Sequence, residues 1–173
     1  MKEWKDDKAL FALIKEELDT AGFVILWIRA IPASFLPPAS ACFFVTRYAA
    51  AGRAMTVLEA DVLDAGKEKG EPGAERSFGL MLEALDDLKE DEAYVCSGSS
   101  PAYALWGELM SARAIQCKAA GAVVNGYSRD TKGILALDFP CFSYGPYAQD
   151  QAPRGKLVID YQVLIEMEGV MDQ

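Results

Sequence analysis

Apolar residues spaced three and four positions apart mark several stretches of the chain. This spacing places apolar side chains on one face of a helix and charged ones on the other. We therefore predict helices over Ala9–Leu18, Phe78–Leu88, Gly107–Ala119 and, in a shorter form, Ile134–Leu137. The second helix carries a stripe predicted to be core: Phe78, Met81, Leu82, Leu85 and Leu88. Gly121 is predicted to end the third helix, as glycine often does.

Short apolar runs between turn-forming residues predict strands. They are Phe23–Ile28, Cys42–Tyr48, Arg53–Ala60, Ala93–Cys96, Ala122–Asn125, Cys141–Tyr144, Leu157–Tyr161 and Val163–Glu166. Loops are predicted at Phe35–Pro38 and Gly66–Gly73, because proline and glycine interrupt helix and sheet. From residue 93 onward strands and helices alternate, which favours an α/β layer with a partly parallel sheet. No repeat or linker interrupts the chain, so we predict a single domain over residues 1–173.

The composition is that of an ordinary globular protein and changes the picture mainly through its charge. Of the 173 residues, 51% are hydrophobic and 25% are charged, which suits one domain with a core of its own. The net charge is −9 and no run of Lys or Arg is present. Nucleic-acid binders need basic patches to neutralise phosphates, so this balance argues against a nucleic-acid partner. It favours a basic protein partner or a bound cation.

The absence of histidine narrows the possible chemistry. It excludes Ser-His-Asp and Cys-His catalysis and every His-ligated metal site. The four cysteines form no C-x-x-C pair, so we expect reduced core cysteines. The acidic N-terminus does not resemble a signal peptide, and the apolar run Gly22–Ile28 is far shorter than the roughly 20 residues that span a bilayer. These features predict a cytoplasmic protein without a membrane segment.

Two short stretches are candidates for chemistry. The first is Trp106–Met110, at a predicted helix start, and the second is Gly126–Asp130, at the end of the next predicted strand. The unpaired amides of a helix start bind carboxylates or phosphates, and Gly107 lets a ligand approach them. The alternative interpretation is that Gly107 merely begins a helix.

Arg129 and Asp130 are the chemically distinctive pair of the second stretch. Arg129 is suited to gripping a carboxylate with two parallel hydrogen bonds, and Asp130 is a hard oxygen ligand for magnesium or manganese. The alternatives are a surface ion pair, or Asp130 capping the next helix. The two stretches converge if the strand Val123–Asn125 lies beside the strand that precedes Gly107.

Together these motifs resemble the RraA-like family. The resemblance rests on Gly107-Glu108-Leu109, on Gly121-Ala122-Val123-Val124-Asn125-Gly126, on Arg129-Asp130, and on Phe139-Pro140 with Phe142. They are similar to the family pattern of G-E/D-L/N, G-x-V-V-x-G, R-D and F-P-V-F. The upstream Gly52–Val57 resembles the family's G-x-A-x-T-V strand. The likeness covers about residues 35–170.

The resemblance implies a fold, an assembly and a site. The fold would be a compact α-β-β-α sandwich of the swivelling type, assembled as trimers or hexamers with sites at subunit interfaces. In the family's aldolases, a pyruvyl carboxylate is held by the amides of the helix start, here Gly107, Glu108, Leu109 and Met110. By the same resemblance Arg129 binds the pyruvyl oxygens, and Asp130 holds a divalent cation, Mg²⁺ or Mn²⁺, largely through waters. Arg129 and Asp130 are thus the implied catalytic residues.

Two departures from the family pattern affect these expectations. The region Ala21–Arg29 lacks the acidic residue of the family's second helix, and family chains continue past the position of Gln173. We therefore expect this chain to lack the usual C-terminal segment, and to be a poorer catalyst and a weaker oligomer than longer relatives.

Three functions follow from the resemblance. The first is a metal-dependent class II aldolase that cleaves 4-hydroxy-2-oxo acids to pyruvate, with oxaloacetate decarboxylation as a side activity. The second is a non-catalytic regulator that binds an RNA-processing enzyme. The third, a methyltransferase, ranks last because no Gly-x-Gly-x-Gly loop follows a predicted strand.

Overall fold

A computed structural model describes residues 5–17, 50–61, 74–100, 103–149, 156–167 and 170–172. The predicted strands Phe23–Ile28 and Cys42–Tyr48 lie outside these residues, as do the predicted loops Phe35–Pro38 and Gly66–Gly73. Within the described part of the chain, no helix is long and apolar enough to cross a membrane.

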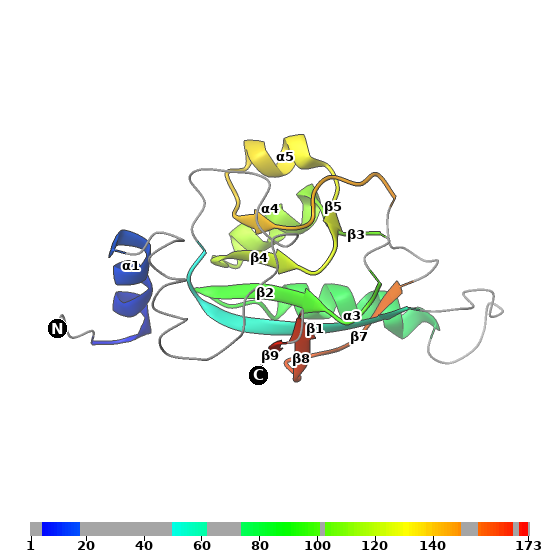
Figure 1. The fold of residues 1–173 in the computed structure, drawn as a ribbon, viewed down its shortest axis with the longest axis horizontal. Coiled ribbons are helices and arrows are strands. Elements are labelled where there is room, and N and C mark those ends of the chain that lie inside the picture. The colour runs from blue at the N-terminus through cyan, green and yellow to red at the C-terminus, as the bar shows by residue number, and fades with distance from the viewer. Residues whose placement is uncertain are drawn as a thin grey trace.

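A five-stranded sheet forms the centre of the molecule (Figure 1). Its strands are, in spatial order, β6 (Cys141–Phe142), β4 (Gly121–Val124), β2 (Glu92–Ser97), β1 (Arg53–Asp61) and β7 (Lys156–Tyr161). The first four run parallel, and β7 pairs antiparallel with β1 at the edge. The predicted strands from residue 53 onward are confirmed here within a few residues.

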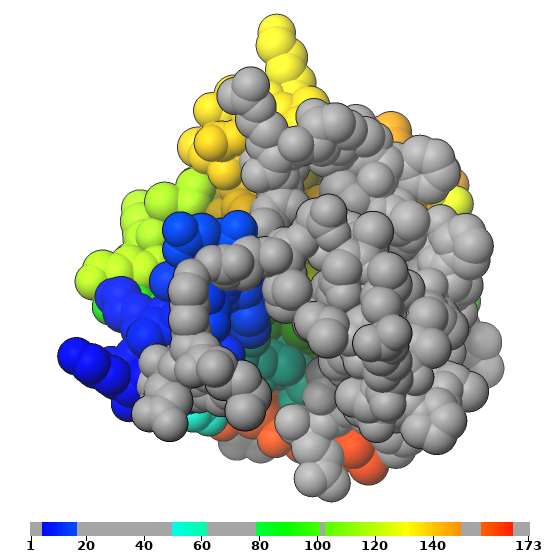
Figure 2. Space-filling view, turned by 60° about the vertical axis from the view of Figure 1, so that its left-hand side comes forward, coloured from blue at the N-terminus to red at the C-terminus, as the bar shows by residue number. Residues whose placement is uncertain are grey.

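Two smaller strand pairs accompany this sheet. β3 (Ala104–Trp106) pairs in parallel with β5 (Tyr127–Ser128), and β8 (Ile165–Met167) pairs antiparallel with β9 (Val170–Asp172). The helices are α1 (Asp7–Glu17), α3 (Ala74–Asp86), α4 (Glu108–Gln116) and α5 (Thr131–Ala136). In Figure 1, α4 and α5 lie on one side of the sheet and the β8–β9 pair lies on the other. Figure 2 shows α1 in blue at the surface, below the yellow-green α4 and the yellow α5.

Successive side chains along each strand point to opposite faces of the sheet. One face is apolar, and the other forms hydrogen bonds to the segment that contains β8. Two rows of register partners are buried in the core: Met55, Tyr94 and Ala122, and then Val57, Cys96 and Val124. Leu85 and Leu88 from the α3 side and Ala114 of α4 belong to the same cluster. On the opposite face, Thr56 Oγ1 donates to Val163 O at 2.6 Å and Ser97 Oγ donates to Glu166 O at 2.6 Å, which attaches the segment of β8.

Two details of the predicted helices are wrong. Leu82 of the predicted core stripe is 46% exposed, because α3 turns its Ala84–Leu85 side to the sheet. Gly121 does not end the preceding helix: α4 ends at Gln116, and Lys118 takes the left-handed conformation with φ 59°. Gly121 instead begins β4, where a Cβ would lie 2.9 Å from Pro140 O and from the Ala50 Cβ. Close packing, and not a helix cap, requires glycine there.

Candidate functional site

The small β3–β5 pair brings the two candidate stretches together. Trp106 and Ser128 are register partners, and the Arg129 amide donates to Trp106 O at 2.9 Å. Gly107 follows β3 and Arg129 follows β5, so both emerge at the same edge. The stretches therefore converge as expected, but the strand beside β3 is β5 and not the predicted Val123–Asn125 strand, because β4 pairs with β2 and β6.

Helix α4 begins without a side-chain cap. Gly107 holds the N-cap position in an extended conformation, φ −152° and ψ 179°, and its carbonyl accepts the Ser111 amide at 3.0 Å. The amides of Glu108, Leu109 and Met110 precede the first intrahelical bond, so helix geometry gives them no acceptor within α4. Their aligned N–H groups give this turn a partial positive charge, which suits an anion. The prediction of a helix start at Gly107 is confirmed.

Gly107 lies directly against the Arg129–Asp130 pair. A Cβ placed on Gly107 would be 3.3 Å from Asp130 Oδ2 and 3.6 Å from Arg129 Nε. A side chain at position 107 would therefore be in tight contact with Asp130 Oδ2 and in van der Waals contact with Arg129. The amide turn, the guanidinium and the carboxylate thus surround one small region, which is the constellation the sequence indicated.

The Asp130 backbone, not its carboxylate, begins the following helix. Asp130 is the N-cap of α5 in the left-handed conformation, φ 53°, and its carbonyl accepts the amides of Gly133 and Ile134 at 2.8 and 3.1 Å. Its side chain makes no capping hydrogen bond, so the capping alternative is not what the carboxylate does. Instead Oδ2 lies 3.5 Å from Arg129 Nε, with the two side chains 49% and 39% exposed. An ion pair this exposed adds little stability.

Glu108 reaches across to α5 and completes the group of charges. Its exposed carboxylate lies so close to Gly133 that a Cβ at position 133 would overlap it. Gly133 is one turn beyond Asp130, so the Glu108 and Asp130 carboxylates both border the first turn of α5. The sequence interpretation missed Gly133. The predicted helix began at Ile134, so the position of Gly133 inside a helix became visible only in the structure.

Buried hydrogen bonds fix the position of Ser128, the residue before Arg129. Ser128 and Ser143 share a hydrogen bond of 3.0 Å between their hydroxyls, and both side chains are buried. The Ser128 amide donates to Gly145 O at 2.9 Å, and Ser128 O accepts the Tyr147 amide at 2.8 Å.

Burial in the core raises the pKa of the Tyr94 phenol, which packs against Trp106, well above its usual value, so this hydroxyl stays neutral.

For a hydrated divalent cation, this region offers one candidate ligand, the Asp130 carboxylate. Among the described residues no group of three His, Cys, Asp or Glu side chains is placed to enclose a metal. A cation here would be held by the Asp130 carboxylate together with waters, which is how Mg²⁺ often binds to proteins. The Asp130 carboxylate is half-exposed and is not used for capping, so it is compatible with that role.

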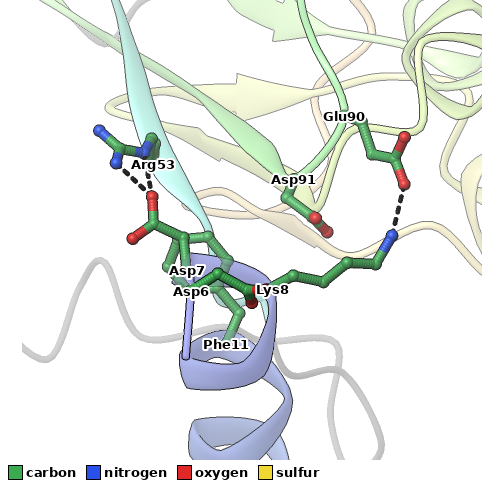
Figure 3. Close-up of a pocket in the computed structure, with 7 residues that line it drawn as sticks. All are labelled: Asp6, Asp7, Lys8, Phe11, Arg53, Glu90 and Asp91. Carbon is green, nitrogen blue, oxygen red and sulfur yellow. Dashed lines mark hydrogen bonds and ion pairs between the residues drawn. The ribbon is translucent and has the colours of Figure 1, made fainter. Parts of the chain in front are cut away.

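A hollow of about 430 Å³ lies away from this region, on the side of the molecule that carries α1 (Figure 3). It is formed where α1 meets the N-terminal ends of β1 and β2. Two ion pairs lie within it: Arg53 Nε donates to Asp7 at 2.7 Å, and Lys8 Nζ donates to Glu90 at 2.7 Å. These ion pairs attach α1 to the N-terminal end of β1 and to the segment before β2. The hollow is separate from the region around Gly107 and Arg129.

Comparisons with known proteins agree with this fold. The protein is of the mixed α/β class, and the start of its helix α4, which has no side-chain cap, lies beside an Arg-Asp pair. The sequence model of the RraA-like family, described as Aldolase/RraA, matches residues 36–172. The chain therefore belongs to the RraA-like family. No curated protein is similar enough in sequence to count as a match.

Solved structures share the fold. One, described as a novel cellulase from microbes associated with the gut ecosystem, is 24% identical, with 99% of this chain and 73% of that chain covered and a TM-score of 0.81. RraAS2 of Streptomyces coelicolor, an unusual member of the RNase ES inhibitor RraA family, is 16% identical, with 98% and 79% covered and a TM-score of 0.74. The RNA-processing inhibitor RraA of Thermus thermophilis is 21% identical, with 90% and 83% covered and a TM-score of 0.61. At these identities the likeness shows the fold alone, and the predicted α/β fold of RraA-like type is confirmed.

Proposed function

We propose that the protein is a divalent-metal-dependent lyase that cleaves 4-hydroxy-2-oxo acids to pyruvate and also decarboxylates oxaloacetate. The observation that carries the proposal is the approach of Asp130 Oδ2 and Arg129 to the start of α4, within 3.3 and 3.6 Å of where a Gly107 Cβ would lie. A small 2-oxo acid suits this arrangement, because its carboxylate is complementary to the amides and the Arg129 guanidinium, and its 2-oxo oxygen would be complementary to a cation held by Asp130.

The substrate carboxylate is bound first in this scheme. The amides of Glu108, Leu109 and Met110 and the guanidinium of Arg129 bind its oxygens, which points the neighbouring 2-oxo group toward Asp130. Asp130, together with waters, would hold a Mg²⁺ or Mn²⁺ ion, which would supply positive charge against the negative charge developing on the 2-oxo oxygen. Arg129 and Asp130 are therefore the catalytic residues of the proposal.

The bond that breaks joins C3 and C4 of the substrate. Its electron pair passes into the enolate of pyruvate, and C3 then gains a proton to give pyruvate. In the aldol substrate, the 4-hydroxyl loses its proton as the second carbonyl product forms, and the exposed Glu108 carboxylate is our candidate to accept it. In oxaloacetate the C4 carboxylate leaves as carbon dioxide, so no hydroxyl proton has to be removed.

Assembly into homotrimers or hexamers remains part of the proposal. Leu109, whose amide belongs to the candidate site, is 81% exposed, and a neighbouring subunit would cover its side chain. Sedimentation velocity tests this point: a monomer at all concentrations would contradict it.

The deciding experiment is an assay of the purified protein with oxaloacetate and with 4-hydroxy-4-methyl-2-oxoglutarate. We expect pyruvate release that requires Mg²⁺ or Mn²⁺ and stops when the metal is chelated. Pyruvate release at the uncatalysed rate with either metal would overturn the proposal.

A second function is supported by the charge of the chain. The net charge of −9 suits a basic protein surface, and one protein of the same fold is described as an RNA-processing inhibitor. A non-catalytic regulator of an RNA-processing enzyme is therefore the alternative. It predicts salt-sensitive binding to such an enzyme that does not depend on Arg129 or Asp130, and no metal-dependent pyruvate release.

A further inference from the structure

We propose that Trp106 and Ser111 are positioning residues that hold the two halves of the candidate site at a fixed separation. The inference rests on the proposed lyase function. It concerns two buried side chains that do not reach the substrate, and which act through the backbone of Gly107 and of Arg129.

Trp106 is bonded to both halves of the site. Its carbonyl accepts the Arg129 amide at 2.9 Å, which fixes the Arg129–Asp130 half. Its indole Nε1 donates to Ser111 Oγ at 2.7 Å, and Ser111 Oγ donates to Gly107 O at 3.1 Å, which fixes the amide turn of α4. The Gly107 carbonyl thus accepts both the amide and the hydroxyl of Ser111.

The indole itself is held rigidly. Trp106 is 1% exposed and Ser111 is 0% exposed, so water does not replace either partner. The indole stacks on Phe139 with ring centroids 5.9 Å apart and an interplanar angle of 11°, and it contacts Tyr94 at 4.9 Å. A buried polar side chain with a fixed ring and a satisfied N–H imposes one geometry on what it binds.

A fixed separation matters because the substrate carboxylate is shared between the halves. The amides lie on α4 and the guanidinium follows β5, so these binding groups come from different elements. A displacement of about 1 Å between them costs about 100-fold in rate. The hydrogen-bond chain through Trp106 and Ser111 ties both elements to one rigid ring.

The test compares Ser111→Ala with Thr56→Val. Both changes remove a buried hydroxyl that hydrogen-bonds to a backbone carbonyl, but Thr56 is on the opposite face of the sheet, where it donates to Val163 O. Each leaves a buried polar group without its partner, so both should lower Tm by about 3–8 °C. Only Ser111→Ala should lower kcat on oxaloacetate, by about 10–100-fold, and raise the inhibition constant of pyruvate.

The Mg²⁺ concentration for half-maximal activity separates positioning from general loosening. We expect it to stay unchanged in Ser111→Ala, because the Asp130 carboxylate is untouched, and we expect Ser111→Cys to recover part of kcat. Trp106→Phe keeps a stacked ring but loses the N–H, so it should show the same loss of kcat with unchanged Mg²⁺ dependence. This variant replaces Ser111→Ala in the test if Ser111→Ala fails to fold.

The turnover of the two variants and of the wild type shows whether the positioning role holds. Wild-type turnover in Ser111→Ala overturns the positioning role, and so does an equal loss of turnover in Thr56→Val. A wild-type protein that releases no pyruvate with Mg²⁺ overturns the proposed function itself, and the positioning role falls with it.

Discussion

The Glu108 carboxylate occupies the space that a side chain at Gly133 would need, so these two residues join the first turn of α4 to the first turn of α5. Glycine inside a helix usually costs about 0.5–1 kcal/mol relative to alanine. At position 133 the absence of a side chain leaves room for the Glu108 carboxylate.

Gly133→Ala should displace the Glu108 carboxylate and impair proton removal from the 4-hydroxyl. Because Glu108 is exposed and flexible, the fold should accommodate the change with little loss of stability. We expect kcat on 4-hydroxy-4-methyl-2-oxoglutarate to fall about tenfold or more, with oxaloacetate decarboxylation little changed. The control is Gly79→Ala in α3, where a Cβ would meet nothing within 4 Å. Equal losses on both substrates would show that Glu108 does not handle the 4-hydroxyl proton.

Asp130→Asn should remove metal-dependent turnover and leave the fold intact. Asparagine tolerates the left-handed conformation that Asp130 adopts, and no capping hydrogen bond is lost. We expect kcat with Mg²⁺ to fall by at least about 100-fold, since the group that would hold the cation loses its charge. The matched control is Asp138→Asn, an exposed aspartate with the same φ of 53° just beyond α5. Unchanged Mg²⁺ activation in Asp130→Asn would exclude the metal role.

Arg129→Lys should weaken carboxylate binding despite keeping the charge. Lysine is a point charge and makes no two-pronged contact, so we expect the inhibition constant of pyruvate to rise about tenfold. Arg113→Lys provides the control, because Arg113 is 42% exposed where Arg129 is 39%, and it pairs with Asp86 on α3. If pyruvate competes equally well against both variants and the wild type, Arg129 does not clamp a carboxylate.

The helices and most of the main sheet were predictable because each element is long enough to show its own period. Leu85 and Leu88, and Ala114 in α4, follow the helical repeat. β1 and β2 are apolar runs bounded by turns. The pair β3–β5 was not predictable in this way. β3 spans three residues and β5 two, which is too short for a period to appear, and their pairing is a tertiary contact.

The candidate site was predictable in its residues but not in its geometry. The motifs placed Gly107, Arg129 and Asp130 at a helix start and after a strand, where ligands commonly bind. The contact of Glu108 with Gly133 joins two helices, so no local pattern encodes it. Gly121 misled in the opposite way: a glycine after a helix suggested a cap, whereas its neighbours Ala50 and Pro140 are distant in sequence.

The attachment of α1 should depend on pH and salt through Glu90. Hydrogen bonds from Lys8 and then Lys118 lower the pKa of the Glu90 carboxyl. A carboxyl with a lowered pKa in the folded state stabilises that state above its unfolded pKa, near 4.3, and loses this contribution as pH falls through the folded value. These groups are exposed, so the effect is small and is screened by salt.

We therefore expect hydrogen exchange of the α1 amides to quicken about 2–5-fold between pH 6 and pH 3, after correction for intrinsic rates, and also in 1 M salt at pH 6. Glu90→Gln should quicken α1 exchange already at pH 6 and remove the part of the pH dependence that Glu90 contributes. Asp86→Asn, which breaks the Asp86–Arg113 pair between α3 and α4, should leave α1 unaffected. Exchange in α1 that is equally slow in Glu90→Gln and the wild type would show that Lys8 and Glu90 do not hold this helix, and that Phe11 or the Arg53–Asp7 pair does so instead.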